Sequence, residues 1–286
     1  WLLRIVGFDP TRERGVETLL TIGNGYAGTR GSLEEGSSAS LPGTFVAGVF
    51  DPIRTEPDPP EDPSESPSLV PVPNWLALSL SVDGEVLTLE RGRVLAHERI
   101  LDLRQGFVVR LWRHRQRGGR ITRLVTLRCA SLADHHVFFQ RVWIVPENYG
   151  GQFRLAAMLD GRVSRDLEPR PHLVPVQQGA VPRGVLCMRT LRSNLSVALA
   201  QESRLCEGEK PVGVQHTEVA ADRLVDWWEW TAEPGRTYVF ERVVATFTSR
   251  ETADPAEAAA RHVGNVWARG TDRLWDEHRR CWAERW

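Results

Sequence analysis

The sequence predicts a mainly β fold, a large antiparallel β-sandwich followed by a helical segment. From about residue 69 to residue 247, runs of alternating apolar and polar residues succeed one another, and the stretches between them have no helical period. These runs number roughly a dozen or more, too many for one flat sheet, so two packed sheets are expected. From Thr252 onward the apolar residues recur every three to four positions, as in helices.

Near the N-terminus, "TIGNGYAGTRG" at 21–31 has the G-x-G-x-x-G spacing of dinucleotide-binding proteins. In those proteins a helix begins near the third glycine and binds the pyrophosphate. Here Gly28 is followed by a stretch rich in Gly and Ser that has no helical period. We therefore expect a tight strand-turn-strand, in which the glycines supply positive φ and close backbone approach. Asn24 also tolerates positive φ in such a turn.

Residues 52–73 are rich in Pro, Glu and Ser, which predicts a mobile surface loop within the sandwich. After this loop, two hairpins are indicated by Asp83-Gly84 and Gly118-Gly119, each placed between alternating runs.

Two helices are expected at the C-terminal end. Asp254-Pro255 is a helix start signal, Gly270 interrupts the run, and Thr271 or Asp272 can cap a second helix. The second helix carries an apolar stripe made of Leu274, Trp275, His278, Trp282 and Trp286. Because an exposed row of tryptophans has to be buried against something, we expect a further domain after the last residue, contacted by Trp275, Trp282 and Trp286.

Composition excludes several classes of function. The 36 basic and 37 acidic residues leave a net charge of −1, so no nucleic-acid or anionic membrane partner is indicated. No apolar run approaches the roughly 20 residues of a membrane span. The four cysteines are far apart, which predicts free thiols. Together with the lack of a secretion signal in the sequence, they suggest a cytoplasmic location.

Five polar residues of the glycine-rich segment are candidates for a substrate cleft or a domain interface: Asn24, Tyr26, Arg30, Glu34 and Glu35. The adjacent carboxylates of Glu34 and Glu35 fit a solvated turn better than a catalytic pair, because inverting pairs are held roughly 6.5 to 9.5 Å apart. Arg30 can pair with either carboxylate.

Two further groups have a structural and a functional interpretation. Trp228 and Trp230 share one strand face, with Trp227 opposite, and either stack on sugar rings or pack in the core. His135 and His136 open a strand, where neighbours point to opposite faces. They are therefore not expected to chelate one metal, and no metal site is predicted.

The segment "TLLTIGNGYAGTRGSLEEG" at 18–36 resembles the opening of glycoside hydrolase family 65, the disaccharide phosphorylases. Further stretches resemble the same family in the same order: "TFVAGVFD" at 44–51, "LVPVPNWLALSLSVDGEVLTL" at 69–89 and "EHRRCWAERW" at 277–286. The resemblance therefore covers nearly the whole chain.

This resemblance implies a supersandwich like that of galactose mutarotase over residues 1–250. It implies a helical linker over 251–286 that leads to an (α/α)6-barrel. In the family the barrel carries the general acid and the phosphate site, so no catalytic residue is expected in this chain. The resemblance implies no cofactor, and inorganic phosphate is the implied co-substrate of the intact enzyme. The implied partners are the barrel, a carbohydrate substrate and a second copy of the chain in a homodimer.

For the intact enzyme, the resemblance implies inverting phosphorolysis of an α-linked glucose disaccharide, with hydrolysis as an alternative within the family. The chain alone is expected to be inactive and to pack on the barrel, forming one wall of the cleft. Two other functions are considered. One is a stand-alone carbohydrate-binding module that uses the tryptophans. The other is an aldose-epimerase-like sandwich with His172, His216 and Glu218 as acid and base candidates.

Overall fold

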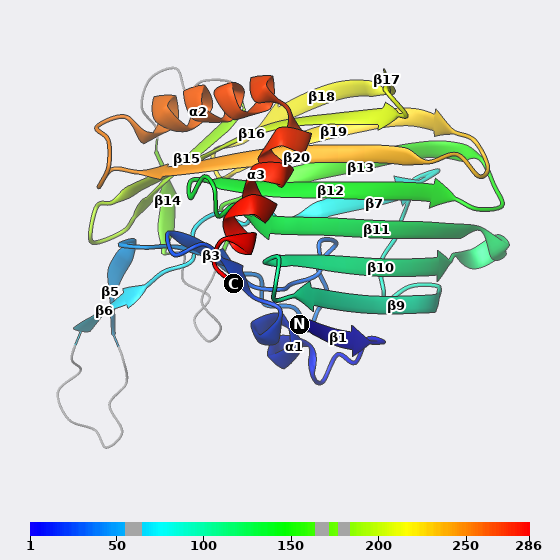
Figure 1. The fold of residues 1–286 in the computed structure, drawn as a ribbon, viewed down its shortest axis with the longest axis horizontal. Helices are drawn as coiled ribbons and strands as arrows, with labels where there is room; N and C mark the ends of the chain where they lie inside the picture. Colours follow the sequence, from blue (N-terminus) through cyan, green and yellow to red (C-terminus); the bar gives the residue numbers. More distant parts are fainter. Residues whose placement is uncertain (55–64, 164–171, 177–183) are drawn as a thin grey trace.

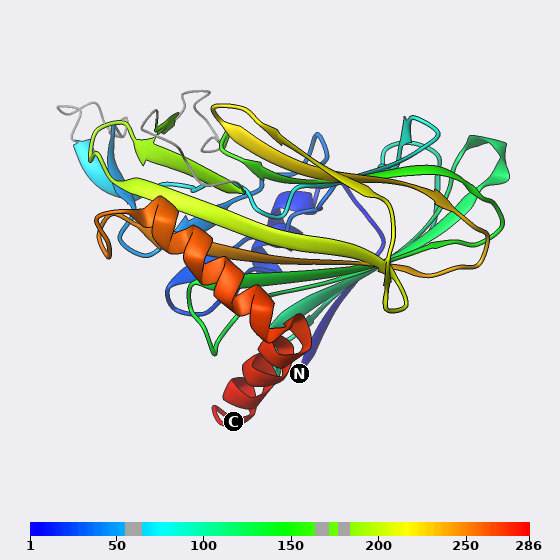
Figure 2. The ribbon, with the colours of Figure 1, turned by 90° about the horizontal axis from the view of Figure 1, so that it is seen from above.

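Two antiparallel sheets packed face to face form most of the structure (Figures 1 and 2). This computed structural model describes residues 1–54, 65–163, 172–176 and 184–286. The larger sheet has ten strands, in the spatial order β1 (Leu2–Val6), β9 (Arg93–Asp102), β10 (Phe107–Arg115), β11 (Ile121–Ala130), β12 (Val137–Pro146), β20 (Tyr238–Thr248), β16 (Ser196–Glu207), β15 (Val185–Thr190) and β14 (Leu173–Pro175), with β17 (Lys210–Pro211) paired to β16.

The second sheet has five strands, in the order β18 (Val214–Val219), β19 (Arg223–Ala232), β13 (Gly151–Asp160), β7 (Leu78–Val82) and β8 (Glu85–Val86). Neighbouring strands in both large sheets are antiparallel, which confirms the predicted fold class. The predicted turns are also confirmed, since Asp83, Gly84, Gly118 and Gly119 all have positive φ. The second of these turns contains a short 3₁₀ segment, η1 (Arg117–Gly119).

The core lies between the two sheets because every second side chain of each strand points inward. In β13, Phe153, Leu155, Ala157 and Leu159 are buried while the residues between them are not. The facing residues of the large sheet include Trp112, Ile144 and Phe240 at one end and Phe138, Leu199 and Val244 at the other.

The two C-terminal helices, α2 (Pro255–Arg269) and α3 (Thr271–Ala283), cover the other face of the large sheet (Figure 2). As predicted, the Asp254 side chain caps α2 by accepting from the Glu257 amide at 3.0 Å, and Pro255 occupies the first turn. The prediction for α3 is wrong: Gly270 is the N-cap, and the Thr271 hydroxyl instead donates to Glu241. The middle strands of the sheet are therefore covered on both faces.

The N-terminal region contains a helix that the sequence did not predict, α1 (Glu13–Leu19). Its residue Val16, with Leu20 and Ile22 that follow it, packs against Leu101 and Val108 of the large sheet.

The glycine-rich segment folds as predicted, into a strand, a turn and a strand: β2 (Ile22–Gly23) pairs with β3 (Ala27–Thr29). β3 pairs on its other side with β4 (Thr44–Val46), which lies after the segment. Gly25 lies in the first turn with φ of 91°, and a Cβ on Gly23 would lie 3.2 Å from the Ala27 carbonyl oxygen.

At both ends of the segment 52–73, which was predicted to be a mobile loop, the structure has β-strands. β5 (Phe50–Arg54) and β6 (Glu65–Leu69) pair as a hairpin, and the following Val70 and Val72 are fully buried in the core. The loop prediction was wrong at these ends because it was based on the Pro, Glu and Ser content and did not take account of the apolar residues Val70 and Val72. The remainder of that loop, residues 55–64, lies outside the described residues.

All four cysteines are free thiols, as the sequence predicted. Across the described part of the chain, no helix is both long and apolar enough to cross a membrane.

Candidate functional site

The structure divides the five polar residues of the glycine-rich segment into two groups. Asn24 and Tyr26 contact a half-exposed cluster of His135, His136 and Glu251, which we call the histidine cluster. Arg30, Glu34 and Glu35 belong instead to ion pairs among buried side chains. His135 and His136 lie in the turn before β12 and Glu251 in the turn after β20. Through Asn24 and Tyr26, the glycine-rich turn is connected to both of these segments.

Asn24 connects two of these segments through its side-chain amide. The carbonyl oxygen accepts from the backbone amides of Tyr26 and Ala27 at 3.1 and 2.9 Å, and the nitrogen donates to the carbonyls of Ser131 and His135 at 2.8 and 3.0 Å. All four hydrogen-bonding positions of the amide are thus used. Asn24 does not adopt positive φ, so this clamp, and not backbone tolerance, explains the asparagine.

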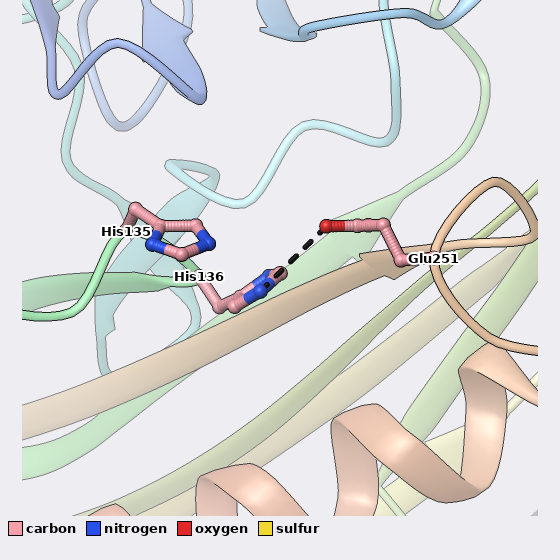
Figure 3. A group of neighbouring side chains, drawn as sticks. All are labelled: His135, His136 and Glu251. Carbon is pink, nitrogen blue, oxygen red and sulfur yellow. Dashed lines mark ion pairs between the residues drawn. The ribbon is translucent and has the colours of Figure 1, made fainter.

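Tyr26 connects the same turn to the end of β20. Its hydroxyl donates to Glu251 Oε2 at 2.6 Å, and burial together with this contact to a carboxylate raises the pKa of Tyr26. The backbone amide and the hydroxyl of Thr248 donate to the same oxygen at 3.1 and 2.9 Å. Three donors therefore hold one oxygen of Glu251, and the other oxygen points towards His136 (Figure 3).

His135 and His136 lie in the turn before β12, not in the strand, so the expectation that they face apart is wrong. Their ring centroids are 4.2 Å apart, and His136 also stacks on Phe247 at 3.9 Å. The His136 Nδ1 contacts the Thr246 carbonyl oxygen at 2.9 Å, and its Nε2 lies 3.7 Å from Glu251 Oε1. Burial lowers the pKa of His136. Glu251 could not be recognised as a partner from the sequence, because it lies 115 or more positions from both histidines.

Arg30 does not pair with Glu34 or Glu35. Its guanidinium donates to the carbonyls of Leu41 and Arg14, each at 2.9 Å, and lies 3.5 Å from Glu17 Oε2. The Glu17 side chain is itself fully buried and also accepts from the Leu41 amide at 2.9 Å. Arg30 therefore fixes α1 to the loop that follows β3.

Glu34 and Glu35 are not in a solvated turn. Arg110 donates to Glu34 and Glu35 at 2.7 Å each, Arg128 donates to Glu34 at 2.9 Å, and the Thr126 hydroxyl donates to Glu34 at 2.8 Å. Burial by itself raises the pKa of Glu34, but the charges of Arg128 and Arg110 outweigh it and lower that pKa to about 2. A general acid has to be protonated at its working pH, so Glu34 is not suited to that role.

One signal in the sequence points to this ion-pair network. Arg110 alternates with Val108 and Trp112 on the inward face of β10, a pattern that places an arginine in the core. A buried arginine requires a carboxylate or several carbonyl oxygens as partners. Glu34 and Glu35 are those partners, across 76 and 75 positions of sequence.

The structure also corrects the sugar-stacking candidates. Trp228 and Trp230 are only 3% and 5% exposed and pack against Phe240 and Phe153 in the core, so neither presents a ring face to a sugar. Trp227 points to the outer face of the five-stranded sheet, where His216 stacks on it at 4.0 Å and Arg154 lies 4.0 Å from its ring centroid.

The aromatic stripe of α3 packs against the sandwich of this chain. Trp275 lies 5.2 Å from Phe107 between ring centroids, and the Trp282 ring lies directly over Gly106. Trp286 lies 4.5 Å from Trp1, and its Nε1 donates to the Arg104 carbonyl at 2.9 Å. Trp275 and Trp282 are thus partly covered by this chain, whereas Trp286 stays 59% exposed, so contact of the stripe with a further domain stays a prediction.

The acid and base candidates of an epimerase are not brought together by any described contact. His216 stacks on Trp227, Glu218 pairs with Arg223 at 3.2 Å, and His172 is buried next to β14. This chemistry needs an acid and a base positioned around one substrate, and these residues do not provide such a pair.

Comparisons with known proteins agree with each other. Residues 3–285 match the family model described as glycosyl hydrolase family 65, N-terminal domain. The whole chain is 32% identical to an uncharacterized glycosyl hydrolase of Mycobacterium tuberculosis, of which it covers 22%. It is 26% identical over its full length to a kojibiose phosphorylase of Halothermothrix orenii, covering 37% of that protein. An α,α-trehalose phosphorylase of Thermoanaerobacter brockii is 27% identical over 88% of the chain, which covers 34% of that protein.

A solved structure supports the fold. A chain described provisionally as a kojibiose phosphorylase from the human microbiome matches 99% of this chain with a TM-score of 0.85 and 16% sequence identity. At that identity the likeness concerns the fold alone. This chain covers 37% of that one, so it spans well under half the length of the proteins it is similar to.

Proposed function

Since the chain belongs to glycosyl hydrolase family 65, as the N-terminal domain of that family, we propose that it is the non-catalytic sandwich of a longer glycoside phosphorylase. The observation that carries the proposal is the match of residues 3–285 to this one domain, combined with coverage of only 37% of a kojibiose phosphorylase. Residues 1–250 would form the sandwich and residues 251–286 a helical linker to the catalytic barrel.

The proposed reaction of the intact enzyme is inverting phosphorolysis of an α-linked glucose disaccharide, with inorganic phosphate as the attacking co-substrate. The two relatives named as kojibiose and trehalose phosphorylases support this substrate class. Hydrolysis is the second candidate, because the relative with 32% identity is named a glycosyl hydrolase. Free thiols at all four cysteines fit a reducing cytoplasm, where we place the enzyme.

The role of this chain would be to support the barrel, to complete one wall of the substrate cleft and to help form a homodimer. The buried ion pairs of Glu34 and Glu35 support a structural role for that loop. Asn24 and Tyr26, the two uncharged residues among the five polar candidates, are partly exposed next to the exposed side chains of His135 and Glu251, so the contact with the barrel is proposed at the glycine-rich turn.

The experiment compares this 286-residue chain with the longer protein that continues into the barrel. Each is incubated with kojibiose, trehalose or maltose, with and without phosphate, and glucose 1-phosphate and glucose are measured. We expect phosphate-dependent glucose 1-phosphate from the longer protein and no product from the short chain. Glucose released without phosphate would establish hydrolysis instead, and turnover by the short chain would overturn its non-catalytic role.

A further inference from the structure

The histidine cluster brings three metal-ligating side chains together from two separate segments. One ligand atom from each of His135, His136 and Glu251 can be chosen so that all three lie within 4.8 Å of one another. The histidines come from the turn before β12, and the glutamate comes from the turn that joins β20 to α2 (Figure 3). Ligand atoms around a tetrahedral zinc ion are about 3.3 Å apart, given Zn–N and Zn–O bonds of about 2.0 to 2.1 Å.

His136 is already oriented as a ligand. Its Nδ1 lies 2.9 Å from the Thr246 carbonyl oxygen, which only accepts, so in the neutral imidazole Nδ1 carries the proton and Nε2 keeps its lone pair. That lone pair is on the side of Glu251 Oε1, 3.7 Å away. Histidine ligands in metal sites have this same arrangement, with the second ring nitrogen donating to a carbonyl or carboxylate. Stacking on Phe247, with 10° between the ring planes, fixes the ring.

Glu251 is also oriented by its neighbours. Tyr26 and Thr248 supply all three hydrogen bonds to Oε2, and Oε1 is the oxygen nearest His136. Such outer contacts hold a ligating carboxylate in one position and make it a better ligand.

His135 completes the set from the solvent side. Its side chain is exposed, and its backbone carbonyl is fixed by Asn24 at 3.0 Å. Within the described part of the chain, neither nitrogen of its ring is assigned a hydrogen bond, so both can reach a ligand. Bringing the ligand atoms from within 4.8 Å to the roughly 3.3 Å of a zinc site requires side-chain adjustment, for which the exposed His135 side chain has space.

We propose that His135, His136 and Glu251 bind one divalent transition metal ion, Zn²⁺ by the chemistry of the donors, with water in the fourth position. A donor set of two imidazoles and one carboxylate binds zinc in preference to magnesium or calcium. The ion joins the turn before β12 to the turn that starts the C-terminal helices. All three ligands belong to this chain, so the site can be tested without the barrel and a failure here leaves the proposed function untouched.

The test uses the 286-residue chain without a histidine tag, stripped with a chelator and then titrated with Zn²⁺ by calorimetry. Co²⁺ is added in a parallel titration, because its visible absorption reports tetrahedral coordination. We expect one Zn²⁺ per chain. His135→Ala and Glu251→Gln should weaken binding by roughly 100-fold or more, and Tyr26→Phe by about 10-fold, as for other outer contacts to a ligand.

His216→Ala is the matched control, because His216 is an exposed histidine on β18 in the other sheet. It should bind as the wild type does. Circular dichroism and urea unfolding are used to check that His135→Ala, at an exposed position, stays folded. No stoichiometric binding by the wild type overturns the proposal. Equal binding by the wild type and His135→Ala also overturns it, and would direct attention to the half-buried thiols of Cys206 and Cys281.

Discussion

The indole of Trp282 lies on the backbone of Gly106, so close that a Cβ on that glycine would be 2.2 Å from the ring. Gly106 also has φ of 65°, in the left-handed region that glycine adopts freely. The contact joins α3 to the turn between β9 and β10. It ties α3 to an edge region of the large sheet, where the Trp282 side chain is partly buried.

Gly106→Ala should therefore lower the free energy of unfolding by about 3 kcal/mol or more, because backbone strain and a steric clash add together. Gly118→Ala is the matched control, since Gly118 has φ of 84° but nothing described lies within 4 Å of its Cβ position. The control should show only the strain, about 1 to 3 kcal/mol. Urea unfolding of both variants gives the difference, and equal losses would show that the indole moves away without penalty.

Glu34→Gln should destabilise the protein by about 3 to 5 kcal/mol, because it leaves the buried guanidiniums of Arg110 and Arg128 without the charge between them. Glu147→Gln, which breaks an exposed pair with Arg113, should cost at most about 1 kcal/mol. Chemical denaturation at pH 7 measures both. The folded pKa of about 2 lies below the unfolded 4.5, so the Glu34 contribution is full above pH 4.5 and is lost as the pH falls towards 2.

His278 is a second acid-sensitive group besides Glu34, and its contacts hold α3 on the sandwich. His278 is fully buried, its Nε2 donates to the Gln105 carbonyl at 2.8 Å, and its Nδ1 accepts from the Leu132 amide at 3.1 Å. Burial lowers the pKa of His278 to about 4, although the Gln105 contact raises it. The unfolded state therefore binds a proton first, and stability is full above pH 6.5 and falls as the pH approaches 4.

The expected size of this loss is about 2 to 3 kcal/mol between pH 7 and pH 4.5. His278→Asn should remove it from the pH dependence of the unfolding free energy, measured in urea at both pH values. His97 remains in the variant, and burial together with the charge of Arg110 lowers its pKa to about 3, so part of the acid sensitivity persists. An unchanged slope in His278→Asn would contradict the assignment.

Asn24→Asp should cost about 1 to 3 kcal/mol, because a carboxylate cannot donate to the two carbonyls that the amide now contacts. The same exchange at Asn148 is the control. Its amide also donates to a carbonyl, that of Gly119, but in an exposed turn where water replaces the bond. Thermal unfolding of both variants is compared with the wild type. Equal shifts would mean that the clamp between the glycine-rich turn and His135 adds no stability.

The strands and helix ends that the sequence predicted correctly all depend on short-range chemistry. Asp83-Gly84 and Gly118-Gly119 specify their turns within four residues, and Asp254-Pro255 starts α2 through a cap three residues long. Period-two alternation places the side chains of β10 and β13 on the correct faces. Such signals need no knowledge of the rest of the chain.

The errors concern residues whose partners are distant in sequence. Glu13 and Glu17 make α1 look like a surface segment, yet Glu13 is buried in a two-bond ion pair with Arg99, 86 positions away. The histidine cluster depends in the same way on Glu251. A carboxylate in a sequence gives no indication of which distant arginine or histidine it will meet, so polarity is read as exposure until the fold is known.

The buried ion pairs also have a consequence for how accurately the sheet forms. Arg99 and Arg110 lie opposite each other across β9 and β10, both with side chains inside, and Arg128 follows on β11. If two of these strands paired one residue out of step, every side chain of the shifted strand would face the opposite way. At least one carboxylate would then be buried without its arginine, at a penalty of about 3 to 5 kcal/mol. The buried charges therefore disfavour misaligned pairing of these strands relative to the native register, because a shifted sheet would have to bury an unpaired charge.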